Sequence, residues 1–214
     1  MIAQHARHTA GYCVWLLFAT GSSSCSNAAE TPPRVQIETF EYAVPMDASS
    51  PWPKFRRTAM QTGRSPVLPI DNGEDPWVFR TGKGIFSTAV IDGDSNVYVG
   101  SGDRVFYKLD KRGNEVWSVL TGEVVDSSAL LDDRGRVYFG SGDGFLYALD
   151  REDGSEVWKL EADPPSLNGA LINWFEGNVA MGVDGTLYVP NDNRCAYASR
   201  GGSAARSKKA PTPS

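Results

Sequence analysis

A repeat of about forty residues constrains the fold of this chain more than any other feature of its sequence. Starting at Trp77, the patterns T-G, S-x-A, V-Y-x-G-S-G-D and Y-x-L-D recur at the same spacing from Trp117. A third copy begins at Trp158, and we expect it to carry about nine extra residues through 173–182 (NWFEGNVAMG) before the pattern resumes at Asp184. A fixed period of roughly 20–50 residues indicates a solenoid, a propeller or another repeat array.

Each unit of the repeat shows the local pattern of β-strands. Short alternating runs rich in Val, Tyr and Phe are separated by turns of Gly, Asp and Asn. In the second unit this pattern predicts strands at 127–131, 136–140, 145–149 and 156–160. Four antiparallel strands per unit describe one propeller blade. The sequence therefore predicts an all-β fold, a partial β-propeller of about three four-stranded antiparallel blades.

The block that ends each unit, Y-x-L-D followed by a glycine turn and E-V-W, closely resembles the PQQ-like repeat of the quinoprotein-like β-propeller family. Upstream, WPKFRR at 52–57 and TGRSP at 62–66 resemble the entry segment common ahead of such propellers in exported bacterial proteins. The resemblance covers residues 52–198. It implies that the tryptophan that begins each unit packs between neighbouring blades, at Trp77, Trp117 and Trp158.

Two functional classes share this resemblance. Family members that are dehydrogenases have eight blades, an axial calcium ion and an adjacent pair of cysteines, whereas the cysteines of this chain, at 13, 25 and 195, are not adjacent. Other members are non-catalytic exported propellers, among them a lipoprotein that assists outer-membrane protein assembly. We therefore expect a non-catalytic module that binds or scaffolds proteins in the bacterial envelope, with no catalytic residue, cofactor or metal site. The alternatives are a remnant or fragment of a PQQ-dependent oxidoreductase, and a truncated product without independent function.

Residues 1–25 have the features of a signal peptide. The apolar run from Ala10 to Thr20 is too short to span a bilayer but fits the core of a secretory signal; a buried N-terminal strand or helix is the alternative. Lipidation at Cys25, after Ser22–Ser24, and ordinary cleavage near Ala28 are both open. Both routes predict an extracytoplasmic protein, in the periplasm or on the outer membrane as a lipoprotein.

Both histidines, His5 and His8, lie in this leader. Once it is removed, the chain has no imidazole for a Ser-His-Asp or Cys-His site or for a histidine-ligated metal. An acidic turn at 91–96 looks like part of a calcium loop, but the matching turns lack its spacing, so we interpret it as ordinary Asp/Asn/Gly turn chemistry.

Composition divides the rest of the chain into four parts. We interpret residues 26–50 as a tether, 51–76 as a propeller entry segment, 77–198 as the PQQ-like repeats and 199–214 as a disordered basic tail. Residues 71–192 contain 22 acids and 10 bases, a net charge of 10 − 22 = −12, which disfavours nucleic-acid binding. A nucleic-acid or membrane role for the tail is the alternative to a solvated end; otherwise we expect membrane contact only through a lipid anchor.

The segment Trp174–Asn178 interrupts the repeat, and insertions in repeat proteins often lie on the binding face. We expect Trp174 and Phe175 to be candidate anchors for a protein partner; the alternative is that the insertion covers a strand edge. Polar residues of the first strands would line any central channel: Ser87, Thr88, Asp126, Ser127 and Asn168. Because about three blades leave open strand edges, we also expect self-association through these edges.

Overall fold

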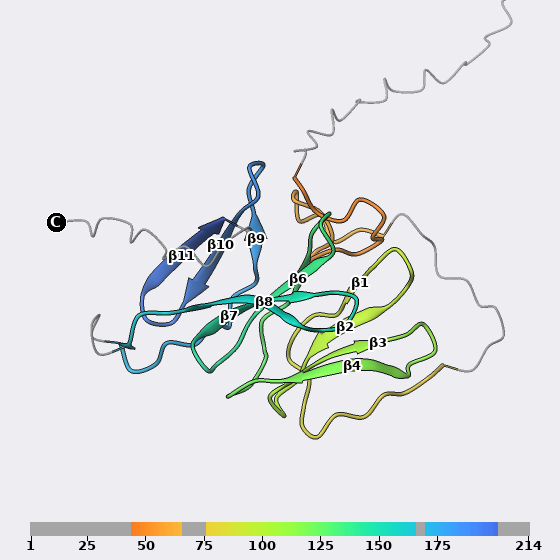
Figure 1. Cartoon of the computed structure of the whole chain (residues 1–214), viewed down its shortest axis with the longest axis horizontal. Coiled ribbons are helices and arrows are strands. Elements are labelled where there is room, and N and C mark those ends of the chain that lie inside the picture. Colours follow the sequence, from red (N-terminus) through yellow and green to blue (C-terminus); the bar gives the residue numbers. More distant parts are fainter. Residues whose placement is uncertain (1–43, 66–75, 166–169, 201–214) are drawn as a thin grey trace, which may run out of the picture. The chain divides into compact units, whose positions relative to one another are not determined.

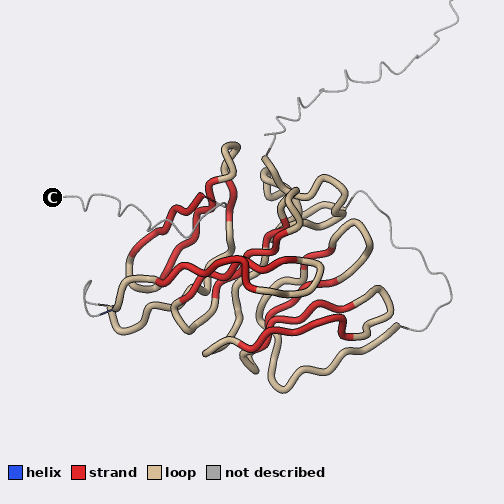
Figure 2. The backbone as a smooth tube through the Cα atoms, viewed as in Figure 1, coloured by secondary structure: helices blue, strands red, loops and turns tan. Residues whose placement is uncertain are grey.

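The structure is a computed structural model that describes residues 44–65, 76–165 and 170–200. These residues all belong to the larger of two compact units, Phe40–Ser214, the smaller being Met1–Thr39. The described residues form three antiparallel sheets and contain no α-helix, and none of them forms a helix that could cross a membrane (Figures 1 and 2). The prediction of an all-β fold with about three blades is confirmed.

The strands of each sheet follow one another in chain order, as in propeller blades. The first sheet contains β1 (Val90–Ile91), β2 (Val97–Gly100), β3 (Val105–Leu109) and β4 (Glu115–Leu120), the second contains β5 (Leu130–Leu131), β6 (Arg136–Gly140), β7 (Phe145–Asp150) and β8 (Glu156–Glu161), and the third contains β9 (Ala180–Met181), β10 (Thr186–Asn191) and β11 (Cys195–Arg200). The third sheet has no fourth strand among the described residues.

Most strands of the second unit lie where the alternation of its residues predicts them. β6, β7 and β8 begin at the predicted residues and extend at most one residue further. β5 is shorter than expected, because Ser127 and Ser128 bond to the third unit instead of to β6. The Ser127 hydroxyl donates to the Gly177 carbonyl (2.8 Å), and the Ser128 amide donates to Asn178 Oδ1 (3.2 Å).

The second sheet is packed on both faces, because successive side chains of a strand point to opposite sides. On β6, Tyr138 belongs to the core shared with the third sheet, whereas Val137 and Phe139 belong to the core shared with the first sheet. The two cores explain why strands of this sheet are apolar at consecutive positions. In the core shared with the first sheet, the rings of Phe106 and Phe139 stack with centroids 3.9 Å apart.

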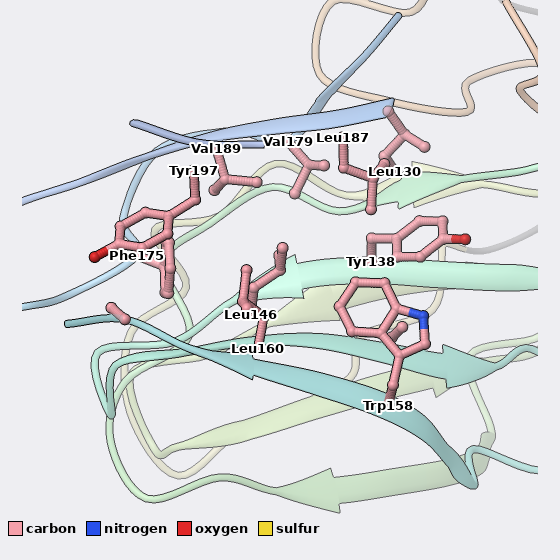
Figure 3. Packing of buried hydrophobic residues seen from close by; sticks show 12 residues of the cluster. Leu130, Tyr138, Leu146, Trp158, Leu160, Phe175, Val179, Leu187, Val189 and Tyr197 are labelled. Carbon is pink, nitrogen blue, oxygen red and sulfur yellow. The ribbon is translucent and has the colours of Figure 1, made fainter. Parts of the chain in front are cut away.

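The core between the second and third sheets is shown in Figure 3. It contains side chains of both sheets and of the connection between them: Leu130, Tyr138, Leu146, Ala148, Trp158, Leu160, Ala162, Phe175, Val179, Leu187, Val189 and Tyr197. The first and third sheets therefore lie on opposite faces of the second.

The segment 44–57 is held against the sheets, although its first residues were expected to be the end of a tether. Isolated β-bridges join Met46 to Asp132, Trp52 to Ile91 and Lys54 to Leu130, so the segment touches the first and second sheets. Arg151 lies in the turn between β7 and β8 and donates from Nη1 to Asp47 Oδ2. This hydrogen bond attaches residue 47 to that turn. At the other end, pairing of β11 with β10 continues to Arg200, two residues into the part expected to be a tail.

Candidate interaction surface

The connections between successive sheets lie at one end of the strands. They run from a fourth strand to the next first strand at 121–129 and 162–179, and an equivalent segment at 81–89 precedes β1. In a four-stranded antiparallel sheet the fourth strand ends on the side where the first begins. We call this side the connection end.

The third connection is nine residues longer than the second. Equivalent backbone hydrogen bonds mark its limits: Thr121 to Arg104 and Val125 to Ser101 in the second connection, Ala162 to Gly144 and Phe175 to Ser141 in the third. Between these points lie residues 122–124 and 163–174, a difference of 12 − 3 = 9 residues. The number of extra residues agrees with the expectation, but their place does not.

The expectation that residues 173–182 carry the insertion is wrong. Trp174–Asn178 takes the place of Val124–Ser128 in the preceding unit, and the extra residues precede it. An alanine at 170, spaced like Ala129, suggested the wrong alignment. The spacing of Phe175 from Ala180, which equals that of Val125 from Leu130, is the signal that would have found the right one.

Phe175 is fully buried and does not offer its ring to a partner. It lies in the core between the second and third sheets, with its ring centroid 5.4 Å from that of Tyr197 (Figure 3). A Cβ at Gly140 would lie 2.4 Å from Phe175 Cβ, so the glycine allows this close approach. Trp174 is half-buried, and its carbonyl accepts the Asp192 amide (3.0 Å). Neither Trp174 nor Phe175 therefore belongs to the nine extra residues of the third connection.

The longer connection instead exposes two aliphatic side chains that sequence reasoning missed. Leu171 is 95% exposed and Ile172 is 40% exposed. By contrast, Val125 in the second connection and Phe175 in the third are fully buried. An exposed pair of this kind would gain free energy by being covered, since a fully buried leucine contributes about 1.5–3 kcal/mol.

Hydrogen bonds fix the longer connection to β10, to β11 and to the turn between them. Asn193 Nδ2 donates to the Asp163 carbonyl (3.0 Å), and the Asp163 amide donates to the Tyr197 hydroxyl (2.8 Å). Farther along, Asn191 Nδ2 donates to the Asn173 carbonyl (2.6 Å). Hydrogen bonds therefore hold the longer connection on both sides of the segment that contains the described residues 170–173.

Carboxylates surround the same end of the strands. Burial, with the charges of Asp192 and Asp126, raises the pKa of Glu176. Burial also raises the pKa of Asp126, whose Oδ1 has no hydrogen-bond partner among the described residues. The charges of Asp192 and Asp126 act on Glu176, so these three carboxylates lie close together at the connection end, which favours partners with basic groups there.

Two cavities lie at the opposite end of the strands, one at each junction between sheets, with volumes of about 500 Å³ and 420 Å³. In them Tyr98 donates to Asp92 Oδ2 and Tyr138 to Asp132 Oδ2, both at 2.8 Å. Burial and these hydrogen bonds raise the pKa of both tyrosines. The lining carries both signs of charge and Arg134 lines both cavities, so neither selects one kind of ion.

The tryptophan that begins a unit contacts the turn after the third strand of the following sheet. Trp117 Nε1 donates to the Arg151 carbonyl and Trp77 Nε1 to the Lys111 carbonyl, both at 3.1 Å. Trp158 lies in the core between the second and third sheets, and its buried Nε1 has no partner among the described residues. Its equivalent acceptor would be residue 201, which lies outside the described part.

The other predicted positions make hydrogen bonds within the fold or lie outside the described residues. Asp92 Oδ1 accepts the amides of Asp94 and Asn96, both at 2.9 Å, which is ordinary turn geometry. The Ser87 hydroxyl donates to the Gly100 carbonyl (2.9 Å), and the Thr88 amide donates to Ser128 Oγ. Cys25 and Asn168 lie outside the described residues.

The resemblance to quinoprotein dehydrogenases implies an adjacent pair of cysteines and a calcium site. None of its three cysteines is adjacent to another. In the described ranges no three His, Cys, Asp or Glu side chains are grouped so that they could hold a metal ion.

Comparison with known proteins identifies one family and several solved structures of similar fold. A family model described as outer membrane protein assembly factor BamB matches residues 62–210. No curated protein matches the chain. Among solved structures, BamB from Moraxella catarrhalis is 26% identical, with a TM-score of 0.49 over 58% of this chain and 36% of that one.

Two quinohemoprotein alcohol dehydrogenases are also similar. The enzyme from Comamonas testosteroni is 22% identical over 77% of this chain and 27% of that one, with a TM-score of 0.58. ADHIIG from Pseudomonas putida HK5 is 20% identical over 79% of this chain and 26% of that one, with a TM-score of 0.57. These two likenesses show a propeller fold. The chain covers between 26% and 36% of each of the three structures.

Proposed function

Because this chain belongs to the family described as outer membrane protein assembly factor BamB, we propose that it is a protein-binding propeller module of the bacterial envelope. It binds or scaffolds proteins and carries out no reaction of its own. The quinohemoprotein likenesses concern the fold alone, and we assign no catalytic residue.

The observation that carries the proposal is the exposed pair Leu171 and Ile172 on the longer third connection. Insertions that depart from a repeat usually lie on the face that binds. Hydrogen bonds hold the carbonyls of Asp163 and Asn173, one on each side of the pair, so the pair loses little conformational entropy when a partner covers it. We propose that Leu171 and Ile172 insert into an apolar pocket of a partner in outer-membrane protein assembly, with the carboxylates of the connection end facing basic groups.

Site-specific photo-cross-linking tests this contact. A photo-reactive side chain at position 171 in the full chain, expressed in cells with an outer membrane, is expected to form an adduct with a component of the outer-membrane assembly machinery, identified by mass spectrometry. The matched control is Val157, a 42% exposed apolar residue on β8. Equal yields of the adduct at positions 171 and 157 would contradict the proposal.

Substitution tests the energetics of the same contact. Leu171→Asp is expected to weaken binding to the captured partner at least about tenfold, which is 1.4 kcal/mol. Val157→Asp, in the control position, is expected to leave the affinity unchanged. Because Leu171 is almost fully exposed, its substitution is not expected to change the melting temperature.

We also propose that residues 1–25 direct export and that the mature protein is periplasmic or anchored to the outer membrane through lipid on Cys25. The apolar run followed by small residues and Cys25 supports this. Intact-mass measurement of the mature protein distinguishes a lipid-modified chain that starts at Cys25 from an unmodified chain cleaved near Ala28. An unprocessed chain recovered from the cytoplasm would count against export.

A further inference from the structure

The segment 81–89 at the connection end carries an exposed aromatic side chain, Phe86, that the proposed function does not use. One backbone hydrogen bond recurs in the three units, at 2.9, 2.9 and 3.0 Å, and its acceptors are the carbonyls of Gly84, Val124 and Trp174. Two places after these acceptors lie Phe86, Asp126 and Glu176, which are therefore equivalent. We call these three residues the connection-end row.

The position of the row faces solvent in each unit. Phe86 is 76% exposed, and Glu176 is also exposed. Asp126 is half-buried and still reaches solvent, although the sheet of its unit packs against both of the others. The residues one place earlier in the second and third units, Val125 and Phe175, are fully buried. Exposure of the row is therefore a property of the repeat, because it is kept in a unit that has a neighbour on each side.

Hydrogen bonds between neighbouring units bring the members of the row together. The Thr88 amide donates to Ser128 Oγ (2.8 Å), and the Ser128 amide donates to Asn178 Oδ1 (3.2 Å). Each of these three residues lies two places after a member of the row, so the row follows the same order across the units. Burial raises the pKa of Glu176, and so does the charge of Asp126, which places these two carboxylates close to each other.

The carboxylates of the row have no cationic partner among the described residues. The ion pairs in that part of the chain join Arg151 to Asp47 and Lys159 to Glu156. Asp126 Oδ1 also accepts no hydrogen bond there. Two nearby carboxylates disfavour the ionised form of each other, and a positively charged donor removes this cost. The row therefore favours a cation over an anion or a purely apolar group.

A ring next to carboxylates suits an arginine side chain. The guanidinium group is planar, so it packs on the face of an aromatic ring and donates two parallel hydrogen bonds to a carboxylate. A lysine ammonium group is a compact and strongly hydrated charge, which gains less from a ring of this kind. Phe86 offers such a ring on the solvent side of the first unit.

We propose that the connection-end row binds an arginine side chain of the protein partner, with the guanidinium packed on the Phe86 ring and hydrogen-bonded to Asp126. Glu176, next in the row, adds a second negative charge. This inference rests on the proposed function, because the partner is the protein that covers Leu171 and Ile172. It gives that partner a chemistry, which is a surface with apolar side chains and at least one arginine.

Peptide binding to the full chain tests the inference without the natural partner. The probes are fluorescein-labelled peptides of leucine and arginine, and matched peptides with citrulline, which has nearly the shape of arginine but no charge. Fluorescence anisotropy is expected to show that the arginine peptide binds at least about tenfold more tightly than the citrulline peptide. A lysine peptide is expected to bind more weakly than the arginine peptide. Equal affinities for arginine and citrulline would overturn the inference, while an adduct at position 171 would still support protein binding.

Variants locate the contact on the row. Phe86→Ala and Asp126→Asn are each expected to weaken binding of the arginine peptide at least about threefold, whereas Phe86→Tyr, which keeps a ring, is expected to retain it. Asp133→Asn is the matched control, because Asp133 is exposed at the opposite end of the strands and its loss changes the net charge equally. Since Phe86 is mostly exposed, its replacement is not expected to change the melting temperature. An unchanged affinity in Phe86→Ala, or equal losses in Asp126→Asn and Asp133→Asn, would reject the row as the site.

Discussion

At the scale of single residues, the packing between units rests on a tryptophan and a glycine. The Trp117 indole lies on Gly154, where a Cβ would meet the ring at 2.8 Å, and its N–H reaches the Arg151 carbonyl three residues earlier. Gly154 has φ +76, a conformation that side chains rarely adopt. Gly154 therefore both forms the turn and provides a flat surface on which the Trp117 ring packs.

This contact predicts unequal effects of two glycine substitutions. Gly154→Ala is expected to lower the free energy of unfolding by about 2–4 kcal/mol, from the positive φ and from the clash with the ring. Gly135→Ala has φ +80 but open space around its Cβ, and is expected to cost about 1 kcal/mol. Urea unfolding of both variants measures the difference, and equal midpoints would show that the ring does not press on the turn.

At the scale of elements, the segment 44–57 contacts the first and second sheets and links them. Asp47 joins it to Arg151, whose carbonyl also accepts from Trp117 and from Lys108 Nζ (2.6 Å). Burial opposes ionisation of Asp47, but the hydrogen bonds from Ser49 and Arg151 outweigh it and lower the pKa of Asp47 below 3.8. The charged form of Asp47 is therefore favoured by folding.

Asp47→Asn is expected to lower the free energy of unfolding by about 1–2 kcal/mol at pH 7. Because the folded pKa is lowered, this stabilisation is present above pH 3.8 and disappears as the pH falls through the folded value. The control is Glu156→Gln, which breaks an exposed ion pair with Lys159 and is expected to change stability by less than about 1 kcal/mol. Thermal melts at pH 7 and pH 3 measure both variants, and a loss that persists undiminished at pH 3 would refute the role of the charge.

At the scale of the whole molecule, tyrosine–aspartate pairs recur through the first two units. Tyr98 and Tyr138 bond to aspartates of the β1–β2 and β5–β6 turns, and Tyr107 and Tyr147 to Asp103 and Asp143. Burial, followed by the aspartate hydrogen bond, raises the pKa of all four tyrosines, that of Tyr107 to about 12. Folding thus favours their neutral forms.

This pattern predicts alkaline unfolding coupled to tyrosine ionisation. Because the folded pKa values are raised, the stabilisation is complete below pH 10 and is lost as the pH rises above it toward the folded values. When tyrosinate absorbance and circular dichroism are followed together between pH 9 and pH 13, the absorbance change of these four tyrosines is expected to coincide with the loss of the fold. Ionisation of all the tyrosines near pH 10 with the fold intact would contradict the prediction.

The third unit shows where sequence reasoning reached its limit. Identities at a constant spacing located the first two units and their strands, since both keep the same turn and core residues. The third connection has few such identities, so Ala170 suggested an alignment that backbone bonds at Ala162 and Phe175 exclude. As a result, a core residue, Phe175, was expected at the surface, and the exposed Leu171 was not identified.

The sequence by itself determined the repeat, the β-strands and the family, because these depend on local alternation, turn residues and spacing. Only the tertiary structure decided which side chains are covered. Burial of Phe175 and exposure of Leu171 depend on how the third connection passes over the second sheet, a contact between residues far apart in the chain. The order of the strands within each sheet likewise follows from pairing between strands, which no local pattern specifies.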